Sequence, residues 1–195
     1  MPHGRMPLRG KADPEAPGAL GHPGAYEVLS KVLFLGRRRR LYGQLVALAG
    51  VGAGDRVLDI GCGPGYLTRL AARSAGPRGA AVGIDPSEEM TRYAARHTKE
   101  PNCTFRKGLG EDLDLADDSF DAVVTSLAVH HIPEDKRERA VAEMYRVLRP
   151  GGRVLIADFR PHRQYVETAG FAELTEGGVR PFLHYVRGVK PPAAA

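Results

Sequence analysis

Short apolar runs and amphipathic stretches alternate along the chain from about residue 56 to residue 157. Apolar runs of this length are typical of buried strands, whereas apolar residues that recur every three or four positions predict helices. A repeated strand–helix–strand order favours a Rossmann-like, doubly wound α/β fold, with a parallel sheet and helices on both of its faces. The predicted strands are 57–60, 80–84, 103–106, 122–126 and 153–157, followed by a short helix at 164–169 and two last strands near 171–175 and 182–187.

Three helices are predicted between the first five strands. The first begins at Tyr66, and the third covers 134–148 and stops before Pro150, which interrupts the helical pattern. In the second helix Ser87 is the expected N-cap, and the acidic residues that follow it suit the positive end of the helix dipole. The residues expected to face the core are Leu67, Leu70 and Ala71 in the first helix, Met90, Tyr93, Ala94 and His97 in the second, and Val141, Met144 and Leu148 in the third.

Composition divides the chain into three parts. Residues 1–24 are rich in glycine and proline and poor in large apolar side chains, which predicts a disordered tail. Residues 25–50 are predicted to form an N-terminal helical cap, and residues 51–190 the α/β domain itself. The apolar side of the cap is expected to consist of Leu41, Leu45, Val46, Leu48 and Ala49. A chain of 195 residues is long enough for one such domain.

The targeting and cysteine signals are weak. No apolar run has the length of a membrane span and the N-terminus has no signal-peptide core, so we expect a cytoplasmic protein without a membrane partner. Cys62 and Cys103 lack metal-binding or redox spacing. They are therefore expected to be reduced and packed, and no metal site is predicted.

The positive charge of the chain admits several interpretations. The formal net charge is +5, and much of the excess lies in the segment Arg37–Arg40. We favour a solvated basic face on the N-terminal helix. A contact for an acidic group of a substrate and an electrostatic patch for RNA are the alternatives.

A glycine-rich turn follows the first strand. Gly61, Gly63 and Gly65 lie between Ile60 and the helix that begins at Tyr66. Glycine allows positive φ, so such a turn lets the backbone lie against a ligand at the N-terminus of a helix. A dinucleotide fingerprint is G-x-G-x-x-G, and here Tyr66 occupies the place of its third glycine. This spacing favours a nucleoside with a small zwitterionic tail over a ligand with a pyrophosphate.

An acidic residue ends the second predicted strand. Asp85 follows the apolar run 80–84, about twenty residues after the glycine turn. A Rossmann-type half places a carboxylate there to accept hydrogen bonds from both ribose hydroxyls. Asp85 is therefore the residue expected to define the nucleoside site.

Five blocks of sequence resemble class I S-adenosylmethionine-dependent methyltransferases, in particular the small-molecule branch of methyltransferase type 11 and of ubiquinone and menaquinone biosynthesis. The likeness extends over about residues 40 to 188, and the blocks occur in the family's order and spacing. It implies S-adenosylmethionine as the cofactor and a seven-stranded, mostly parallel sheet with one antiparallel strand near the C-terminus. The blocks are Asp59–Gly65, Gly83–Ser87, Leu113–Val124, Ser126–His131 and Val147–Gly152.

The resemblance implies roles for particular residues. Asp59 would orient the methionine amine, Asp85 would bind the ribose, and Ser126 would bring a backbone carbonyl to the methionine end. Backbone contacts are expected from the turn, and adenine contacts from side chains of the second helix and from the loop after the third strand. The residues in these two groups are Gly61, Cys62 and Gly63 for the turn, and Pro86, Met90, Gly110 and Glu111 for the adenine.

His130 and His131 are the catalytic candidates, because histidine titrates near neutrality and could take a proton from a hydroxyl or amine nucleophile. Of the two, His131 is expected to point inward, since the loop to the third helix starts directly after it. Tyr42, Tyr66 and His162 are weaker candidates for lining the substrate pocket.

The chain departs from the family pattern at two places. Leu109 occupies the position where relatives often carry Asp or Asn against the adenine amine, so Gly110 or Glu111 would have to substitute. Only residues 159–163 fill the gap in which relatives often insert a helical lid. The site is therefore either open to a large acceptor or closed by the N-terminal helix or by a second subunit in a homodimer.

The predicted function is methyl transfer from S-adenosylmethionine to an oxygen, carbon or nitrogen nucleophile of a small molecule. A nicotinamide oxidoreductase is disfavoured by the glycine spacing and by the His130–His131 block. An RNA methyltransferase would explain the charge, but Ser126–Val129 differs from the Asn/Asp-Pro-Pro-aromatic loop expected for base methylation. A non-catalytic S-adenosylmethionine binder, such as a regulatory scaffold, is a further alternative because of Leu109 and the short lid region.

Overall fold

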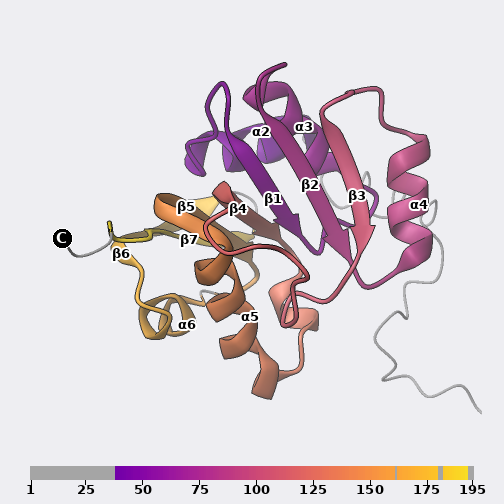
Figure 1. Ribbon diagram of the computed structural model, residues 1–195. Helices are drawn as coiled ribbons and strands as arrows, with labels where there is room; N and C mark the ends of the chain where they lie inside the picture. Colours follow the sequence, from indigo (N-terminus) through magenta and orange to yellow (C-terminus); the bar gives the residue numbers. More distant parts are fainter. Residues whose placement is uncertain (1–37, 161, 180–181, 193–195) are drawn as a thin grey trace, which may run out of the picture.

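A seven-stranded sheet lies at the centre of the computed structural model, which describes residues 38–160, 162–179 and 182–192 (Figure 1). The strand order is β3-β2-β1-β4-β5-β7-β6. The strands are β1 Arg56–Ile60, β2 Ala80–Asp85, β3 Cys103–Lys107, β4 Phe120–Ser126, β5 Leu148–Asp158, β6 Ala172–Val179 and β7 Leu183–Val189.

The strands β1 to β5 pair in parallel, whereas β7 runs antiparallel to both of its neighbours, β5 and β6. This is the predicted fold, including the single strand of opposite direction near the C-terminus. The order reverses between β1 and β4, and ligands of doubly wound sheets bind at the carboxyl ends of the strands that flank such a reversal. In the register of the sheet, Asp59 near the end of β1 lies beside Gly83 of β2 and Val124 of β4.

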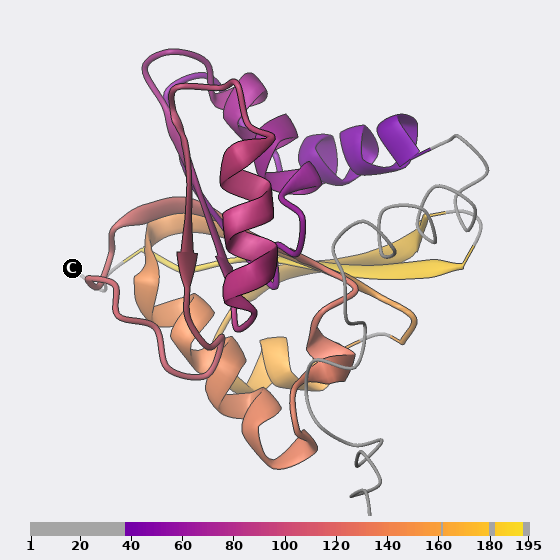
Figure 2. The same cartoon turned by 90° about the vertical axis from the view of Figure 1, so that its right-hand side faces the viewer.

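Helices cover both faces of the sheet, as Figure 2 shows from the side. One apolar core cluster joins the sheet to α2 and α3, and a second joins it to α5 and α6. The helices are α2 Arg38–Leu48, α3 Tyr66–Ala75, α4 Glu88–Arg96, α5 Glu134–Val147 and α6 Arg163–Thr168, with a 3₁₀ turn η1 at Val129–His131.

The long strand β5 is the main difference from the predicted elements. The sequence predicts a strand that starts at Arg153, but β5 begins at Leu148, directly after α5. Leu148 pairs with Phe120, and a register shift separates this pair from the next one, Ala122 with Arg153. The residues Pro150 and Gly151 therefore lie within an irregular strand, because pairing to β4 continues on both sides of them.

Helix α4 is capped as predicted, because the Ser87 Oγ accepts a hydrogen bond from the Met90 N–H at 3.3 Å. Met90 and Ala94 are buried against the sheet as expected. The prediction for His97 is wrong: this residue is exposed, and its ring stacks on Tyr93 with centroids 3.9 Å apart. His97 follows the last helical residue, where the chain already turns outward.

The apolar side of α2 matches the pattern predicted for the N-terminal cap, since Leu41, Leu45, Val46 and Ala49 are buried. The predicted tail at 1–24 and the first part of the cap, residues 25–37, lie outside the described residues. Within the described residues, no helix is both long and apolar enough to pass through a lipid bilayer.

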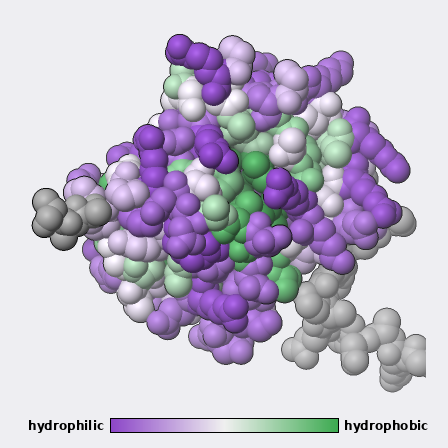
Figure 3. Space-filling view, in the orientation of Figure 1, coloured by the Kyte–Doolittle hydropathy of each residue, from purple (hydrophilic) through white to green (hydrophobic). Residues whose placement is uncertain are grey.

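The segment 108–119 between β3 and β4 contains no helix. Val82 and Leu115 are consequently only half-buried on this side of the molecule. Figure 3 shows the view onto this side, where apolar surface lies between polar side chains.

Candidate functional site

The three glycines of the turn between β1 and α3 all have positive φ, namely 70° at Gly61, 49° at Gly63 and 76° at Gly65. A Cβ at Gly61 would collide with the Ala128 Cβ, and one at Gly65 would lie 2.5 Å from the ring of Phe105. A Cβ at Gly63 would meet no atom of the described residues within 4 Å. Two of the glycines thus allow close packing, while Gly63 faces open space where a ligand could approach the backbone.

Asp59 is a buried carboxylate below this turn, with an exposed fraction of 1%. Its Oδ2 accepts a hydrogen bond of 2.6 Å from the Thr68 hydroxyl on α3, a partner that the sequence analysis missed. Burial raises the pKa of Asp59 to about 7, and the nearby Asp85 adds to the rise although the Thr68 hydrogen bond opposes it. Burial disfavours the ionised form of this carboxylate, so a cationic group placed beside Asp59 would stabilise it.

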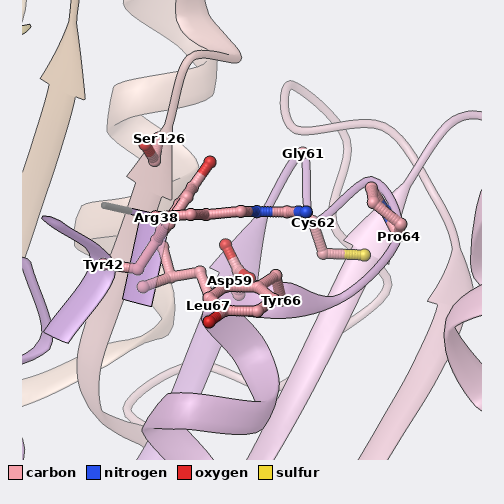
Figure 4. Close-up of a pocket in the computed structure, with 9 residues that line it drawn as sticks. All are labelled: Arg38, Tyr42, Asp59, Gly61, Cys62, Pro64, Tyr66, Leu67 and Ser126. Atoms are coloured by element: carbon pink, nitrogen blue, oxygen red, sulfur yellow. The ribbon is translucent and has the colours of Figure 1, made fainter. Parts of the chain in front are cut away.

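A small pocket opens above Asp59, with a cavity of about 20 Å³, room for about one water molecule (Figure 4). The backbone of the glycine turn, α2 and the end of β4 contribute to its walls. The lining residues are Arg38, Tyr42, Asp59, Gly61, Cys62, Pro64, Tyr66, Leu67 and Ser126.

Arg38 extends across this pocket toward the turn at Gly61 and Cys62, above Asp59 (Figure 4). Its exposed fraction is 6%, and its guanidinium carbon lies 4.3 Å from the centroid of the Tyr66 ring. The interpretation of the basic segment as a solvated face is therefore wrong for Arg38. It holds for the exposed Arg39 and Arg40, while Arg37 lies outside the described residues.

Ser126 ends β4 at the wall of the same pocket. Its Oγ is buried and has no hydrogen-bond partner among the residues that the structure describes. A buried hydroxyl without a partner is costly unless a ligand or water satisfies it. Together with the buried Asp59 and the open face of Gly63, it provides a polar cradle of the kind that an amino acid's ammonium and carboxylate groups require.

Asp85 ends β2 beside the turn, and both of its oxygens are held by backbone N–H groups. Oδ2 accepts from Gly63 and Oδ1 accepts from Ser87, each at 2.9 Å. Burial raises the pKa of Asp85, while these hydrogen bonds and the nearby His131 oppose the rise. The carboxylate is thus fixed in orientation, and each oxygen keeps lone pairs for a diol.

The residues expected near an adenine lie on both sides of Asp85. Pro86 is exposed, whereas Met90 and Gly110 are buried. Glu111 is 8% exposed and its Oε1 lies 3.2 Å from the Lys136 Nζ on α5, so this carboxylate already has a partner. Leu109 is 46% exposed and offers an apolar surface at the position where relatives often carry a polar side chain.

The Cys62 side chain is buried beneath the turn, and burial raises the pKa of its thiol well above the usual value. The thiol therefore stays protonated and is a poor nucleophile. That only the backbone of Cys62 contributes to the site stays a prediction.

His130 and His131 belong to η1, just beyond β4. The Nδ1 of His130 lies 2.7 Å from the Oδ1 of Asp158, which ends β5, and the His130 N–H donates to Oδ2 at 3.1 Å. His131 is exposed, and partial burial of its ring and the neighbouring His130 lower its pKa. The expectation that His131 is the inward-pointing histidine is therefore wrong, because Asp158 anchors His130 instead.

Asp158 is a further residue beside the site that was not predicted from the sequence. Its side chain is fully buried, and its Oδ1 also accepts a hydrogen bond of 2.7 Å from the Phe159 N–H. Burial alone would raise the pKa of Asp158, but its contacts with His130, His162 and the Phe159 N–H hold it well below the usual range. The available signal was its position at the carboxyl end of β5, which pairs with β4, one of the two strands that flank the reversal of strand order.

The fold and the site together are those expected of a protein that binds a nucleoside carrying an amino-acid tail. Comparison with known proteins agrees. A family model described as a methyltransferase domain matches residues 57–152. A solved S-adenosylmethionine-dependent methyltransferase from Aquifex aeolicus has the same fold, with a TM-score of 0.67 at 21% sequence identity over 76% of this chain and 89% of that chain.

Two curated relatives are similar in sequence. The chloroplastic 2-phytyl-1,4-beta-naphthoquinone methyltransferase of Arabidopsis thaliana is 36% identical over 149 residues, which are 73% of this chain and 56% of that protein. The arsenite methyltransferase of Halobacterium salinarum is 38% identical over 130 residues, which are 65% of this chain and 31% of that protein. The chain thus spans less than two thirds of either relative.

The chain belongs to the class I S-adenosylmethionine-dependent methyltransferases, as predicted from its motifs. The cofactor of this family is S-adenosylmethionine. The described site is chemically suited to it, because it holds a buried carboxylate, a buried hydroxyl without a hydrogen-bond partner among the described residues, and a second carboxylate fixed by backbone N–H groups.

Proposed function

We propose that this chain transfers a methyl group from S-adenosylmethionine to an oxygen, carbon or nitrogen nucleophile of a small molecule. The single observation that carries the proposal is the placement of Asp59 and Asp85 near the carboxyl ends of the neighbouring strands β1 and β2, with the Asp85 carboxylate accepting a hydrogen bond from the Gly63 N–H of the turn. When bound, the cofactor supplies an activated methyl group on a sulfonium. The protein then has to bind it, align it with the acceptor and exclude water.

Each end of the cofactor has proposed partners. Asp85 accepts hydrogen bonds from the ribose hydroxyls, and the turn at Gly61–Gly63 carries the backbone contacts. Asp59 binds the methionine ammonium, whose charge compensates the buried carboxylate. Arg38 and Ser126 bind the methionine carboxylate, because a guanidinium and a hydroxyl are suitable donors for it.

The adenine is proposed to lie between Met90 and Pro86 of the α4 side and the loop at Gly110. Leu109 would cover the ring by apolar contact. This would replace the hydrogen bond from the missing Asp or Asn, and Glu111 would contribute little because it pairs with Lys136.

A small-molecule acceptor is favoured over RNA, although the net charge of +5 would suit RNA. Both curated relatives are named for small acceptors, a naphthoquinone and arsenite. The basic segment that motivated the RNA alternative includes Arg38, which lies in the pocket and not on the surface. A cytoplasmic location and closure of the site by a second subunit stay proposals.

The test is isothermal titration calorimetry with S-adenosylhomocysteine, the demethylated product, and with NADPH. We expect binding of the first and none of the second. Asp85→Asn removes charge-assisted hydrogen bonds worth about 1.5–3 kcal/mol each, so we expect the affinity to fall by at least about tenfold.

Asp112→Asn is the matched control, because the Asp112 side chain is 75% exposed and pairs only loosely with Arg139, at 3.4 Å. The control should bind S-adenosylhomocysteine like the original protein. Equal affinities of the Asp85 variant and the control would overturn the assignment of the ribose site. Binding of S-adenosylhomocysteine without methyl uptake by any phenol, quinol, amine or arsenite would instead support the non-catalytic alternative.

A further inference from the structure

Asp158 and His130 form a carboxylate–imidazole pair, buried at its carboxylate end, beside the cofactor pocket. The Asp158 side chain is fully buried, whereas the His130 side chain is 32% exposed. The pair is held at both ends, since the backbone N–H groups of His130 and Phe159 donate to the same carboxylate. The Nε2 of the buried His162 lies 3.5 Å from the Asp158 Oδ2, so a second histidine borders the same carboxylate.

The charge state of Asp158 determines the tautomer of His130. The contacts of Asp158 hold its pKa well below the usual range, so it is an ionised carboxylate at neutral pH. An ionised carboxylate only accepts hydrogen bonds, so the His130 Nδ1, at 2.7 Å, must carry the proton. In the neutral ring Nε2 is then the free acceptor.

Aromatic side chains continue from this histidine along the surface. The ring centroid of His130 lies 4.0 Å from that of His131 and 5.1 Å from that of Phe159, and Phe159 in turn lies 5.7 Å from Phe182. Phe159 is 45% exposed, which is unusual for a large apolar side chain among the described residues. An apolar aromatic surface of this kind suits a flat aromatic molecule.

This aromatic surface lies next to the methionine end of the cofactor site. Ala128, just before η1, packs against Gly61 of the turn, and Ser126 lies in the pocket itself. From Ala128 the chain continues into η1, where His130 contacts Asp158. A molecule on the aromatic surface would thus be close to the transferable methyl group.

We propose that Asp158 is a positioning residue that holds His130 as the general base for a planar aromatic acceptor with an ionisable hydroxyl, such as a phenol or hydroquinone. The proposal rests on the proposed function and names its acceptor class. The hydroxyl proton moves to the His130 Nε2, and the oxygen forms the new bond to the methyl carbon. Where a ring carbon that shares the oxygen's electrons attacks instead, that carbon then loses its own hydrogen as a proton and the oxygen takes a proton back, so that the ring is aromatic again. The electron pair of the broken carbon–sulfur bond stays on sulfur, and the imidazolium is stabilised by Asp158 until it loses its proton to water.

The first test uses the cofactor-free protein and does not depend on activity. Nitrogen-15 NMR of the histidine rings at a pH where His130 is neutral should show a single tautomer with the proton on Nδ1. Asp158→Asn should give a mixture of tautomers, because an amide can donate as well as accept. A mixture in the original protein, or the proton on Nε2, would overturn the proposal.

The second test uses 1,4-naphthohydroquinone, catechol and 1-naphthol as acceptors, with arsenite for comparison. His130→Ala should lower kcat on the phenolic acceptor by about 100-fold or more, with little change in S-adenosylhomocysteine affinity. Added imidazole should restore part of the rate. Asp158→Asn should lower kcat while the KM for the acceptor changes less. His97→Gln, on the exposed end of α4, is the matched control and should behave like the original protein.

The outcomes distinguish a failure of the proposed function from a failure of the proposed role of Asp158 and His130. Failure of the original protein to bind S-adenosylhomocysteine would contradict the proposed function itself. Normal binding and phenol methylation with a His130→Ala rate within threefold of the original would contradict only the role of the pair. Methylation of arsenite but of none of the three phenols would contradict the aromatic acceptor. Because Asp158 is buried, His130→Ala at its half-exposed position keeps the proposal testable if the Asp158 variant does not fold.

Discussion

Replacing Asp59 by Asn should stabilise the ligand-free protein at alkaline pH while weakening cofactor binding. Burial raises the pKa of Asp59 from 3.8 to about 7, so the folded protein holds a proton there that the unfolded chain has already released. The contribution of this group to stability is therefore complete below pH 3.8 and is lost as the pH rises to about 7.

The size of the effect follows from that interval. At about 1.36 kcal/mol per pH unit, the distance from 3.8 to about 7 corresponds to about 4 kcal/mol as an upper bound. Asn lacks the charge and can still accept the hydrogen bond from Thr68. We expect Asp59→Asn to raise the free energy of unfolding by about 2 kcal/mol or more at pH 8 and by much less at pH 4. For a protein of this size, that is a rise in Tm of about 4 °C or more.

The assay is thermal unfolding at pH 4, 6 and 8, with and without S-adenosylhomocysteine, and Asp112→Asn serves as the control. The ligand should raise the Tm of the original protein strongly, because its ammonium compensates Asp59, and should raise that of the variant much less. A variant that is no more stable than the original at pH 8, or that gains equally at pH 4 and pH 8, would refute the reasoning.

Two further predictions concern the pocket and the turn. Arg38→Ala should weaken binding of S-adenosylhomocysteine by about tenfold but leave binding of 5′-methylthioadenosine, which lacks the amino-acid end, unchanged, as calorimetry can measure; equal losses for both ligands would contradict a contact to the carboxylate. Gly61→Ala should lower the Tm, because its Cβ would collide with Ala128 at a positive φ. Gly63→Ala, whose Cβ meets no atom of the described part of the chain within 4 Å, should fold with a smaller loss of stability and show its main defect in S-adenosylhomocysteine affinity. Equal loss of stability in the two glycine variants would contradict this division of roles.

The parts of the fold that depend on local pattern were predictable from the sequence. Asp59 and Asp85 could be placed at neighbouring strand ends because parallel strands bring their carboxyl ends to one edge of the sheet. The Ser87 cap and the buried faces of α2 and α5 follow from helical periodicity in the same way. The start of β5 at Leu148 was not predictable, because its pairing with Phe120 overrides the breaking effect of Pro150 and Gly151.

Contacts between distant segments explain what was missed at the site. In the sequence, Arg38 is one member of a basic run and has no feature that distinguishes it from its neighbours. In the structure, its packing on Tyr66 places it in the pocket. The choice between His130 and His131 depends on Asp158, which lies in a different strand. Sequence spacing alone does not define such contacts, although the position of Asp158 at a strand end provided a signal.

A crystal structure of the protein with S-adenosylhomocysteine would test the central claim most directly. We expect both ribose hydroxyls to donate to the Asp85 carboxylate, and the amino-acid end to lie between Asp59, Ser126 and Arg38. A ligand bound elsewhere, or one whose ribose does not contact Asp85, would contradict the account.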